Sequence, residues 1–258
     1  MDAGKIFRLD GRVALITGAS SGLGARFAEV ASANGAAVVL VARRRARLDA
    51  LKAKIEKSGG RALAAPADVT DPEALAGAFD AAEKAFGTVD LMVANAGIAR
   101  VARALDMTRE TWREVLDADL DAVYFGCQEA AKRMVAANKP GAIVTIASIA
   151  GFGVERGLSA YNVAKAGVLQ ATKALALELA RRQIRVNAIA PGYIVTEINR
   201  EFLLSEEGEK IRARLPLNRL GEPADLDGAF LLLSSDAGRG ITGSVIVVDN
   251  GHLLLGLA

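Results

Sequence analysis

Short runs of apolar residues alternate along the chain with longer segments that have the spacing of helices. The runs are continuous and rich in Val, Ile, Leu and Ala, as expected for strands that are buried on both faces of a parallel sheet. They cover residues 13–17, 37–41, 61–65, 91–94, 142–147, 185–189 and 244–248. Helices are predicted at residues 25–34, 43–58, 72–86, 108–138, 156–180 and 224–235.

This alternation of strands and helices predicts an α/β fold. Because parallel strands are joined by right-handed crossovers, we expect a Rossmann-like, doubly wound parallel sheet of about seven strands with helices on both faces. A chain of 258 residues with 52% hydrophobic content is long enough for one large core, so residues 1–258 are interpreted as a single domain.

Composition narrows the possible partners and the compartment. The formal net charge is +2 and the basic residues are spread through the helices, so we expect neither nucleic acid nor an anionic membrane surface as a partner. The amino end has no stretch of signal-peptide length, and the longest weakly polar run, residues 142–154, is too short to span a bilayer. Cys127 is the single cysteine, so an internal disulfide is excluded. Because it lies in an apolar predicted helix, we expect it to have a packing role. These features predict a cytoplasmic protein.

A glycine-rich turn follows the first predicted strand. The sequence Thr17-Gly-Ala-Ser-Ser-Gly-Leu-Gly24 stands between that strand and a helix. In this order the glycines let the backbone approach a dinucleotide pyrophosphate, which the free N–H groups at the helix N-terminus would bind. The residues expected to hold a dinucleotide cofactor here are Gly18, Ser20, Ser21, Gly22, Leu23 and Gly24.

A second group of residues carries candidate chemistry. Tyr161 and Lys165 lie one turn apart on a predicted helix, so both side chains project from the same face. The positive charge stabilises the phenolate, which makes the phenol a proton donor and acceptor near neutral pH. Ser148 ends a predicted strand at the sheet's carboxyl edge, where open α/β folds hold their ligands. Such a Tyr-x-x-x-Lys pair also arises by chance on solvated helix faces. The glycine turn is the feature that favours a catalytic role for this pair.

The end of the second predicted strand bears on cofactor choice. An acidic residue there binds the ribose 2′-hydroxyl of NAD, whereas an arginine accommodates the extra phosphate of NADP. This chain has Arg43-Arg44-Arg45. Three cations at the start of a helix oppose its dipole, which costs about 0.3–1 kcal/mol for each exposed charge. This cost favours an anionic partner for the arginines over the alternative that they are only solvated. We expect NADP(H), with NAD(H) as the alternative, and contacts from Arg43 and then Arg44.

The glycine turn, the set of Ser148, Tyr161 and Lys165, and their order resemble the short-chain dehydrogenase/reductase family over nearly the whole chain. The resemblance implies that Tyr161 is the catalytic acid/base, that Lys165 assists it and binds the nicotinamide ribose, and that Ser148 orients the substrate oxygen. It implies a homotetramer or homodimer as well. The further cofactor residues that it implies are Asp68, Val69, Asn95, Ala96, Gly97, Pro191, Gly192, Ile194 and Thr196.

Two positions depart from the family pattern. Ala94 replaces an asparagine that many members carry before Asn-Ala-Gly. This chain has Asp119 seven residues after Trp112. At that position the family has an asparagine, which helps to hold a water between the active-site lysine and solvent. If the backbone carbonyl holds that water, the change is mild. If an ionised side chain lies near Lys165, it stabilises the ammonium and weakens its effect on Tyr161, so Asp119 is a candidate catalytic residue.

The substrate side carries fewer signals. Residues 197–216 are interpreted as a mobile helical flap over an apolar substrate, although packing against the domain explains them equally well. His252 is interpreted as structural, no metal cluster is visible, and the apolar tail at residues 253–258 suggests a subunit contact. The candidate substrate residues are Ser148, Phe152, Val154, Tyr193 and Phe202, and the other apolar residues of the flap are Ile198, Leu203 and Leu204.

Together these features predict an NADP(H)-dependent oxidoreductase that transfers hydride between the nicotinamide and a carbonyl or secondary alcohol. In reduction, Ser148 would hold the carbonyl oxygen while Tyr161 protonates it. Within the enzyme class, the alternative is a 3-oxoacyl thioester reductase of the acyl-carrier-protein type. Outside that class, the alternative is a dinucleotide-binding regulator without turnover, which the presence of both Tyr161 and Lys165 disfavours.

Overall fold

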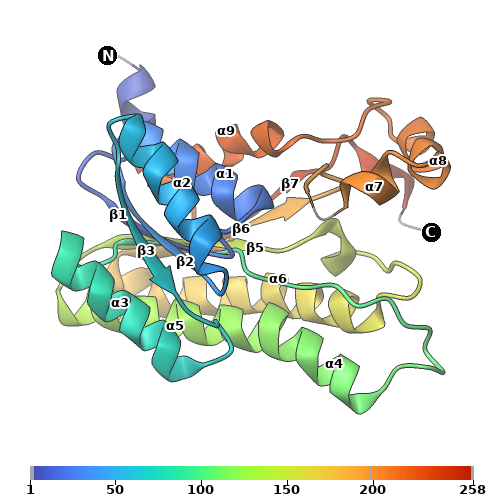
Figure 1. Cartoon of the computed structure of the whole chain (residues 1–258), viewed down its shortest axis with the longest axis horizontal. Coiled ribbons are helices and arrows are strands. Elements are labelled where there is room, and N and C mark those ends of the chain that lie inside the picture. Colours follow the sequence, from blue (N-terminus) through green and yellow to red (C-terminus); the bar gives the residue numbers. More distant parts are fainter. Residues whose placement is uncertain (1–2, 198, 257–258) are drawn as a thin grey trace.

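The computed structural model describes residues 3–197 and 199–256. These residues form seven parallel strands in the order β3-β2-β1-β4-β5-β6-β7 (Figure 1). The strands are β1 (Val13–Thr17), β2 (Ala37–Ala42), β3 (Arg61–Pro66), β4 (Leu91–Ala94), β5 (Gly141–Ile146), β6 (Ile184–Pro191) and β7 (Val245–Val248). Each strand begins and ends within two residues of its expected limits, and the predicted fold class is confirmed.

Helices cover both faces of the sheet (Figure 1). One face carries α1 (Gly22–Ala33), α2 (Arg45–Lys57) and α9 (Asp227–Ser234), and the other carries α3 (Pro72–Phe86), α5 (Ala122–Ala136) and α6 (Ser159–Leu179). The remaining α-helices of the described residues are α4 (Arg109–Leu116), α7 (Arg200–Leu203) and α8 (Glu206–Arg214). In this part of the chain, no helix is both long and apolar enough to cross a membrane.

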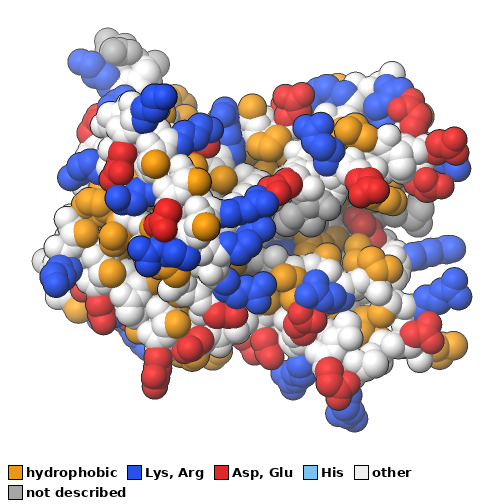
Figure 2. Space-filling model, in the orientation of Figure 1, with side chains coloured by type: hydrophobic (Ala, Val, Ile, Leu, Met, Phe, Trp, Pro, Cys, Tyr) orange, Lys and Arg blue, Asp and Glu red, His pale blue; other side chains and the backbone are white. Residues whose placement is uncertain are grey.

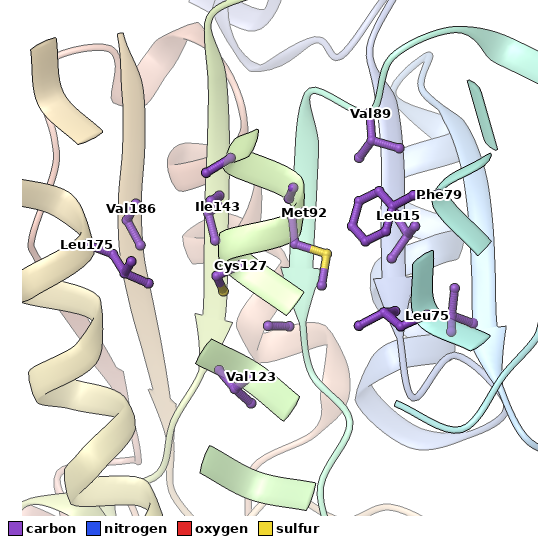
Figure 3. Packing of buried hydrophobic residues seen from close by; sticks show 14 of the residues in the cluster. Leu15, Leu75, Phe79, Val89, Met92, Val123, Cys127, Ile143, Leu175 and Val186 are labelled. Carbon is purple, nitrogen blue, oxygen red and sulfur yellow. The ribbon is translucent and has the colours of Figure 1, made fainter. Parts of the chain in front are cut away.

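Apolar clusters fill the space between the sheet and each helical layer. Met92 of β4 lies on the α3 and α5 side, in one cluster with Phe79 and Cys127 (Figure 3). Its neighbour Val93 belongs to the opposite cluster, together with Phe27 of α1. Successive side chains of a strand point to opposite faces, which explains why both are apolar. Cys127 is fully buried, and burial raises the pKa of its thiol to about 12, so the predicted packing role is confirmed.

Two predicted helices differ from those in the structure. The single helix expected at residues 108–138 is interrupted by a π-helical turn, Asp117–Asp121, in which the N–H of Ala122 donates to the carbonyl of Asp117. Apolar periodicity does not register one widened turn, although such turns are frequent at functional sites. The helix expected from residue 156 begins only at Ser159, because Gly157 has a φ of +76° in the left-handed region.

The order of the strands creates the site. β1 lies between β2 and β4, so the chain builds one half of the sheet through β3 and then returns to build the other. At such a reversal the loops at the carboxyl ends of the two central strands diverge and leave a crevice for a ligand. The glycine turn after Thr17 and the segment that begins at Asn95 flank this crevice.

Candidate active site

A cavity of about 830 Å³ opens at the carboxyl ends of the central strands. Figure 2 shows this face of the molecule hollowed between the α7–α8 segment above and the helix α4 below. The expected catalytic and cofactor residues come together in it, with Gly24 as the one exception. Lining the cavity are Gly18, Ser20, Ser21, Gly22, Leu23, Arg43, Arg44, Asp68, Val69, Asn95, Ala96, Gly97, Asp119, Ser148, Tyr161, Lys165, Pro191, Gly192, Ile194 and Thr196.

Gly24 packs beside the cavity rather than in its wall. A Cβ at this position would overlap the carbonyl oxygen of Gly18 and would lie 2.6 Å from Asn95 Nδ2. Only a glycine lets α1 come this close to the turn. Gly18 and Gly22 have φ angles of +68° and +55°, which also favour glycine. The three glycines therefore serve both the turn's own backbone and its fit to the first helix.

Thr17 holds together the end of the cavity that the glycine turn lines, which we call the cofactor end. It was not among the residues predicted from the motif. Its buried hydroxyl accepts hydrogen bonds from the N–H groups of Asn95 and Ala96, at 3.0 Å each, and donates to the carbonyl of Val93 at 3.4 Å. Asn95 Nδ2 returns a bond to the carbonyl of Thr17 at 2.9 Å. A buried hydroxyl needs hydrogen-bond partners. The position of Thr17 at the end of an otherwise apolar strand was therefore the feature of the sequence that could have predicted this role.

Two arginines before and at the start of α2 face the cavity. The guanidinium of Arg44 donates to the hydroxyls of Ser20 and Ser21, at 2.8 Å each, and so joins α2 to the glycine turn. Nη1 of Arg43 lies 3.6 Å from Asp68 Oδ2, and the Arg43 side chain is 74% exposed. Because this side chain is exposed and its ion pair with Asp68 is long, the Arg43 guanidinium can turn toward a phosphate.

Arg45 and Arg47 have other partners. Arg45 pairs with Asp49, one turn further along α2, at 2.9 Å and does not line the cavity. Arg47 makes a two-fold contact with Glu197, from Nη1 to Oε2 at 2.5 Å and from Nη2 to Oε1 at 2.7 Å. This ion pair connects α2 with the segment that follows β6, which begins the expected flap.

The three expected catalytic side chains share one wall of the cavity. Ser148 follows β5, and its hydroxyl oxygen accepts a hydrogen bond from the N–H of Ala150 at 3.1 Å. Tyr161 and Lys165 project from neighbouring turns of α6, with Lys165 Nζ 5.4 Å from the centroid of the Tyr161 ring. The ammonium also donates to the carbonyl of Ile146 at 3.2 Å. These contacts orient an ammonium toward a phenol beside a fixed hydroxyl.

Asp119 is in direct contact with Lys165. Its Oδ2 lies 3.1 Å from Lys165 Nζ, and the two side chains are only 0% and 5% exposed. Its Oδ1 accepts a hydrogen bond from the N–H of Ile98 at 2.6 Å. The π-helical turn carries Asp119 to this position, and Gly97 leaves room for it, since a Cβ on Gly97 would lie 2.6 Å from Oδ2. The carboxylate, whose place the sequence left open, thus faces the active-site lysine.

Burial and charge act in opposite directions on Lys165. Burial, the largest influence, lowers the pKa of the ammonium, whereas the charges of Asp119 and Tyr161 and the hydrogen bond to Asp119 raise it. The net result is a pKa above the usual lysine value. Lys165 therefore keeps its positive charge throughout the neutral range.

The expected substrate residues other than Ser148 do not line the cavity. Tyr193 is half-buried, and Phe152, Val154 and Phe202 are 51%, 70% and 53% exposed. These side chains would contact a substrate only beyond the wall that the cofactor residues share.

The flap and the carboxyl end agree with expectation only in part. The flap contains α7 and α8 as expected for a helical segment, but Leu203 is 2% exposed and packs inside the protein, while Ile198 lies outside the described residues.

His252 is buried, and Leu254 and Leu255 of the tail are 85% and 59% exposed in the single chain. Residues 257–258 of the tail also lie outside the described part. Among the residues that the structure describes, no group of three His, Cys, Asp or Glu could hold a metal ion.

Comparison with known proteins identifies the family. Residues 18–252 match the family described as enoyl-(acyl carrier protein) reductase. The chain is 39% identical over 257 residues to the galactitol 2-dehydrogenase (L-tagatose-forming) of Cereibacter sphaeroides, across 98% of this chain and 99% of the relative.

Solved structures agree with the sequence matches. A short-chain type dehydrogenase/reductase from Mycobacterium marinum superimposes with a TM-score of 0.92 at 38% identity, over 96% of this chain and 98% of that chain. A gluconate 5-dehydrogenase from Burkholderia cenocepacia J2315, in complex with NADP and tartrate, does so with a TM-score of 0.91 at 32% identity, over 96% and 97%. The chain therefore belongs to the short-chain dehydrogenase/reductase family and is an oxidoreductase, as its motifs predicted.

Proposed function

We propose that the protein is an NADP(H)-dependent dehydrogenase that interconverts a secondary alcohol and the corresponding carbonyl compound. The observation that carries this proposal is the meeting of Ser148, Tyr161 and Lys165 in one cavity with the glycine turn. A proton donor, a charge that stabilises its deprotonated form and a hydroxyl that orients an oxygen are what such a reaction requires. NADP(H), when bound, supplies or accepts the hydride.

Three side chains act on the substrate oxygen in this proposal. The Ser148 hydroxyl, which already accepts a hydrogen bond from the N–H of Ala150 at 3.1 Å, donates a hydrogen bond to the carbonyl oxygen and orients it. Tyr161 transfers its proton to that oxygen in reduction and takes it back in oxidation. Lys165 stays charged and stabilises the phenolate that Tyr161 becomes.

The charge at the end of β2 favours NADP(H). Arg43 and Arg44 line the cavity directly after β2, where an NAD-dependent enzyme would place an acidic residue. A guanidinium presents several N–H donors in a plane and matches a phosphate well. The NADP in the structure of the Burkholderia gluconate 5-dehydrogenase supports the same choice. NAD(H) is the alternative, because the glycine turn serves the pyrophosphate that both cofactors share.

Asp119 changes the charge balance of the proposed active site. Its contact with Lys165 at 3.1 Å offsets part of the positive charge that acts on Tyr161. In this proposal Asp119 acts on the reaction through Lys165, so it is a positioning residue rather than a proton donor.

The proposal extends to assembly and surroundings. We expect one domain that spans residues 1–258, a helical flap at residues 197–216 over the substrate, and a cytoplasmic homotetramer or homodimer. Several exposed apolar side chains support self-association: Phe125, Leu177 and Leu254 are 57%, 81% and 85% exposed in the single chain. Apolar side chains as exposed as these are usually covered by a partner.

Reduction of a 3-oxoacyl thioester is the second candidate. The description of the matching family names an acyl-carrier-protein substrate, which supports an acyl thioester, although an enoyl reductase reduces a carbon–carbon double bond and not a ketone. The named activities of the galactitol and gluconate relatives favour small hydroxylated substrates instead. A dinucleotide-binding regulator without turnover is disfavoured, because Ser148, Tyr161 and Lys165 are all present in the cavity.

A substrate panel tests the proposal. The purified enzyme is assayed with NADPH against simple ketones, ketoses, steroid ketones and 3-oxoacyl thioesters, and with NADP⁺ against the matching alcohols, by the absorbance of NADPH. We expect turnover of at least one class that Tyr161→Phe abolishes and Tyr124→Phe preserves, since Tyr124 lies outside the cavity. Cofactor binding without turnover of any class would contradict the proposal, and so would turnover that does not depend on Tyr161.

A further inference from the structure

The segment that follows β6 runs from the sheet toward the helix α2. We call residues 194–197 of this segment the strap. Backbone hydrogen bonds hold its root: the N–H of Val195 donates to the carbonyl of Gly221 at 2.8 Å, and the N–H of Gly221 donates to the carbonyl of Tyr193 at 2.9 Å. The strap therefore starts from a fixed position near the carboxyl end of β6.

Thr196 of the strap lies directly against the glycine turn. A Cβ on Gly22 would lie 3.6 Å from both Cβ and Cγ2 of Thr196, which is ordinary van der Waals contact. The N–H and the hydroxyl of Thr196 both donate to Oδ1 of Asn199, at 2.7 Å and 3.1 Å, and fix its conformation. Gly22, Thr196 and Asn199 all line the cavity. The strap thus passes beside the N–H groups that are expected to bind a pyrophosphate.

Glu197 fastens the other end of the strap to α2. Nη1 and Nη2 of Arg47 contact Oε2 and Oε1 of Glu197 at 2.5 Å and 2.7 Å. The helix α2 follows β2, and in the sheet β1, β4 and β5 lie between β2 and β6. The strap and this ion pair therefore span the carboxyl edge of the sheet above β1 and β4, whose diverging loops form the crevice.

The charges around the ion pair keep it formed but do not make it permanent. The hydrogen bond from Arg47 and the charge of Arg47 lower the pKa of Glu197, burial acts in the opposite direction, and the charge of Arg44 lowers this pKa further. Glu197 is therefore ionised near neutral pH. The side chains of Arg47 and Glu197 are 45% and 57% exposed, so water and salt screen their attraction. Such a pair holds two segments together and still lets them separate.

We infer that Arg47 and Glu197 are positioning residues that fasten the strap over a bound dinucleotide and so set the rates at which the cofactor enters and leaves. The inference rests on the proposed function, because it requires a dinucleotide at the glycine turn. Thr196 covers a pyrophosphate that lies against Gly22, so the strap must lift before the cofactor leaves, and lifting breaks the ion pair. NAD(H) and NADP(H) share this pyrophosphate, so both should be affected alike.

Rates of cofactor release test this role. The release of NADPH and of NADH is followed by stopped-flow fluorescence, with an excess of the oxidised cofactor to prevent rebinding. Glu197→Gln removes the charge and nearly keeps the shape, so both release rates should rise by about two- to fivefold, as expected for the loss of an exposed ion pair. Arg47→Glu should also raise both rates. The double variant Arg47→Glu/Glu197→Arg restores the pair in reverse and should return both rates nearly to the wild-type values.

Arg45→Glu is the matched control. It makes the same change of charge on the same helix, but Arg45 pairs with Asp49 outside the cavity, so both release rates should stay nearly unchanged. Melting temperatures close to that of the wild type show that the variants are folded, since all the altered side chains are exposed.

Three results would overturn the role of the strap and leave the dehydrogenase function standing. The first is a pair of release rates that Glu197→Gln leaves unchanged. The second is a double variant that does not recover. The third is a faster release of NADPH alone, which would show that Arg47 contacts the 2′-phosphate directly. A wild-type enzyme that binds neither NADPH nor NADH would overturn the strap and the proposed function together.

Discussion

The two ends of the cavity are built by different kinds of contact. At the cofactor end, backbone groups dominate: the Thr17 hydroxyl alone binds two N–H groups and one carbonyl at the end of β4, and Gly24 packs directly on Gly18. At the substrate end, individual side chains hold the loops in place, as Asn162 of α6 holds the backbone of Glu155. Strand ends and glycines therefore define one end, and individual side chains define the other.

This difference explains which part of the enzyme can vary. A pyrophosphate is bound by N–H groups that every residue type supplies, so the cofactor end depends on the shape of the backbone and tolerates little change in it. Side chains on loops can be exchanged without disturbing the strands that position them. Changes at the two ends should consequently affect different quantities, and by different amounts.

The largest effect is expected where the two ends meet, at Tyr161. Tyr161→Phe removes the transferable proton and keeps the ring, so turnover should fall by about 10²–10⁴ while cofactor affinity is nearly unchanged. The measurements are the steady-state rate with NADPH and the cofactor Kd by calorimetry. Tyr124→Phe is the matched control and should retain full activity. A Tyr161→Phe enzyme with more than about a tenth of the wild-type rate would contradict the acid/base role.

A smaller effect is expected at the cofactor end, from Arg43. Its charge-assisted contact with the 2′-phosphate should contribute about 1.5–3 kcal/mol, so Arg43→Ala should weaken NADPH binding by roughly tenfold to more than a hundredfold and leave NADH binding nearly unchanged. Arg45→Ala is the control, because Arg45 pairs with Asp49 outside the cavity. Calorimetric titration with both cofactors decides the matter. Equal weakening of NADPH and NADH binding, or a wild-type preference for NADH, would count against the NADP assignment.

Thr17 distinguishes the two ends by stability. Thr17→Val keeps the volume but leaves the N–H groups of Asn95 and Ala96 without their acceptor, so the free energy of unfolding should fall by about 1–3 kcal/mol. At the substrate end, Phe152→Ala changes a side chain that is 51% exposed and should alter the free energy of unfolding by less than about 0.5 kcal/mol. Urea denaturation of the apoenzymes compares the two. A Thr17→Val protein as stable as wild type would show that the hydroxyl is dispensable.

The smallest effect is expected from Asp119→Asn and concerns pH. The Asp119 charge raises the pKa of Lys165 and offsets the ammonium's effect on Tyr161. Without that charge the pKa of Lys165 falls, so the high-pH limb of the rate of alcohol oxidation, where Lys165 loses its proton, should move to lower pH by up to about one unit, equivalent to about 1.4 kcal/mol.

The pH–rate profiles of the two enzymes provide the measurement, with the rate at neutral pH and the melting temperature as checks on folding. Asparagine keeps the acceptor for the N–H of Ile98, so the fold should persist. Profiles of wild-type and Asp119→Asn enzymes that superimpose would refute the electrostatic role of Asp119. In that case its bond to Ile98 would be its only contribution.

The apolar pattern and the motifs were sufficient to predict the sheet and most of the cofactor end. Strands buried on both faces are short apolar runs, and their positions were predicted to within two residues. The glycine turn and the motifs after β4 and β6 lie at strand ends, so strand prediction alone places them at one edge of the sheet. Nineteen of the residues predicted from these motifs, from Asp68 and Val69 after β3, from the arginines after β2 and from the Ser148, Tyr161 and Lys165 set line the same cavity, besides Asp119.

Contacts between segments far apart in the chain could not be predicted from the sequence pattern. The meeting of Asp119 and Lys165 depends on a π-helical turn that the apolar pattern does not reveal, and the ion pair of Arg47 and Glu197 depends on how the segment after β6 lies against α2. The two kinds of interaction differ in range. Hydrophobic periodicity and turn chemistry act between near neighbours in the chain, whereas a hydrogen bond between side chains of different loops is set by the packing of the whole sheet and its helices.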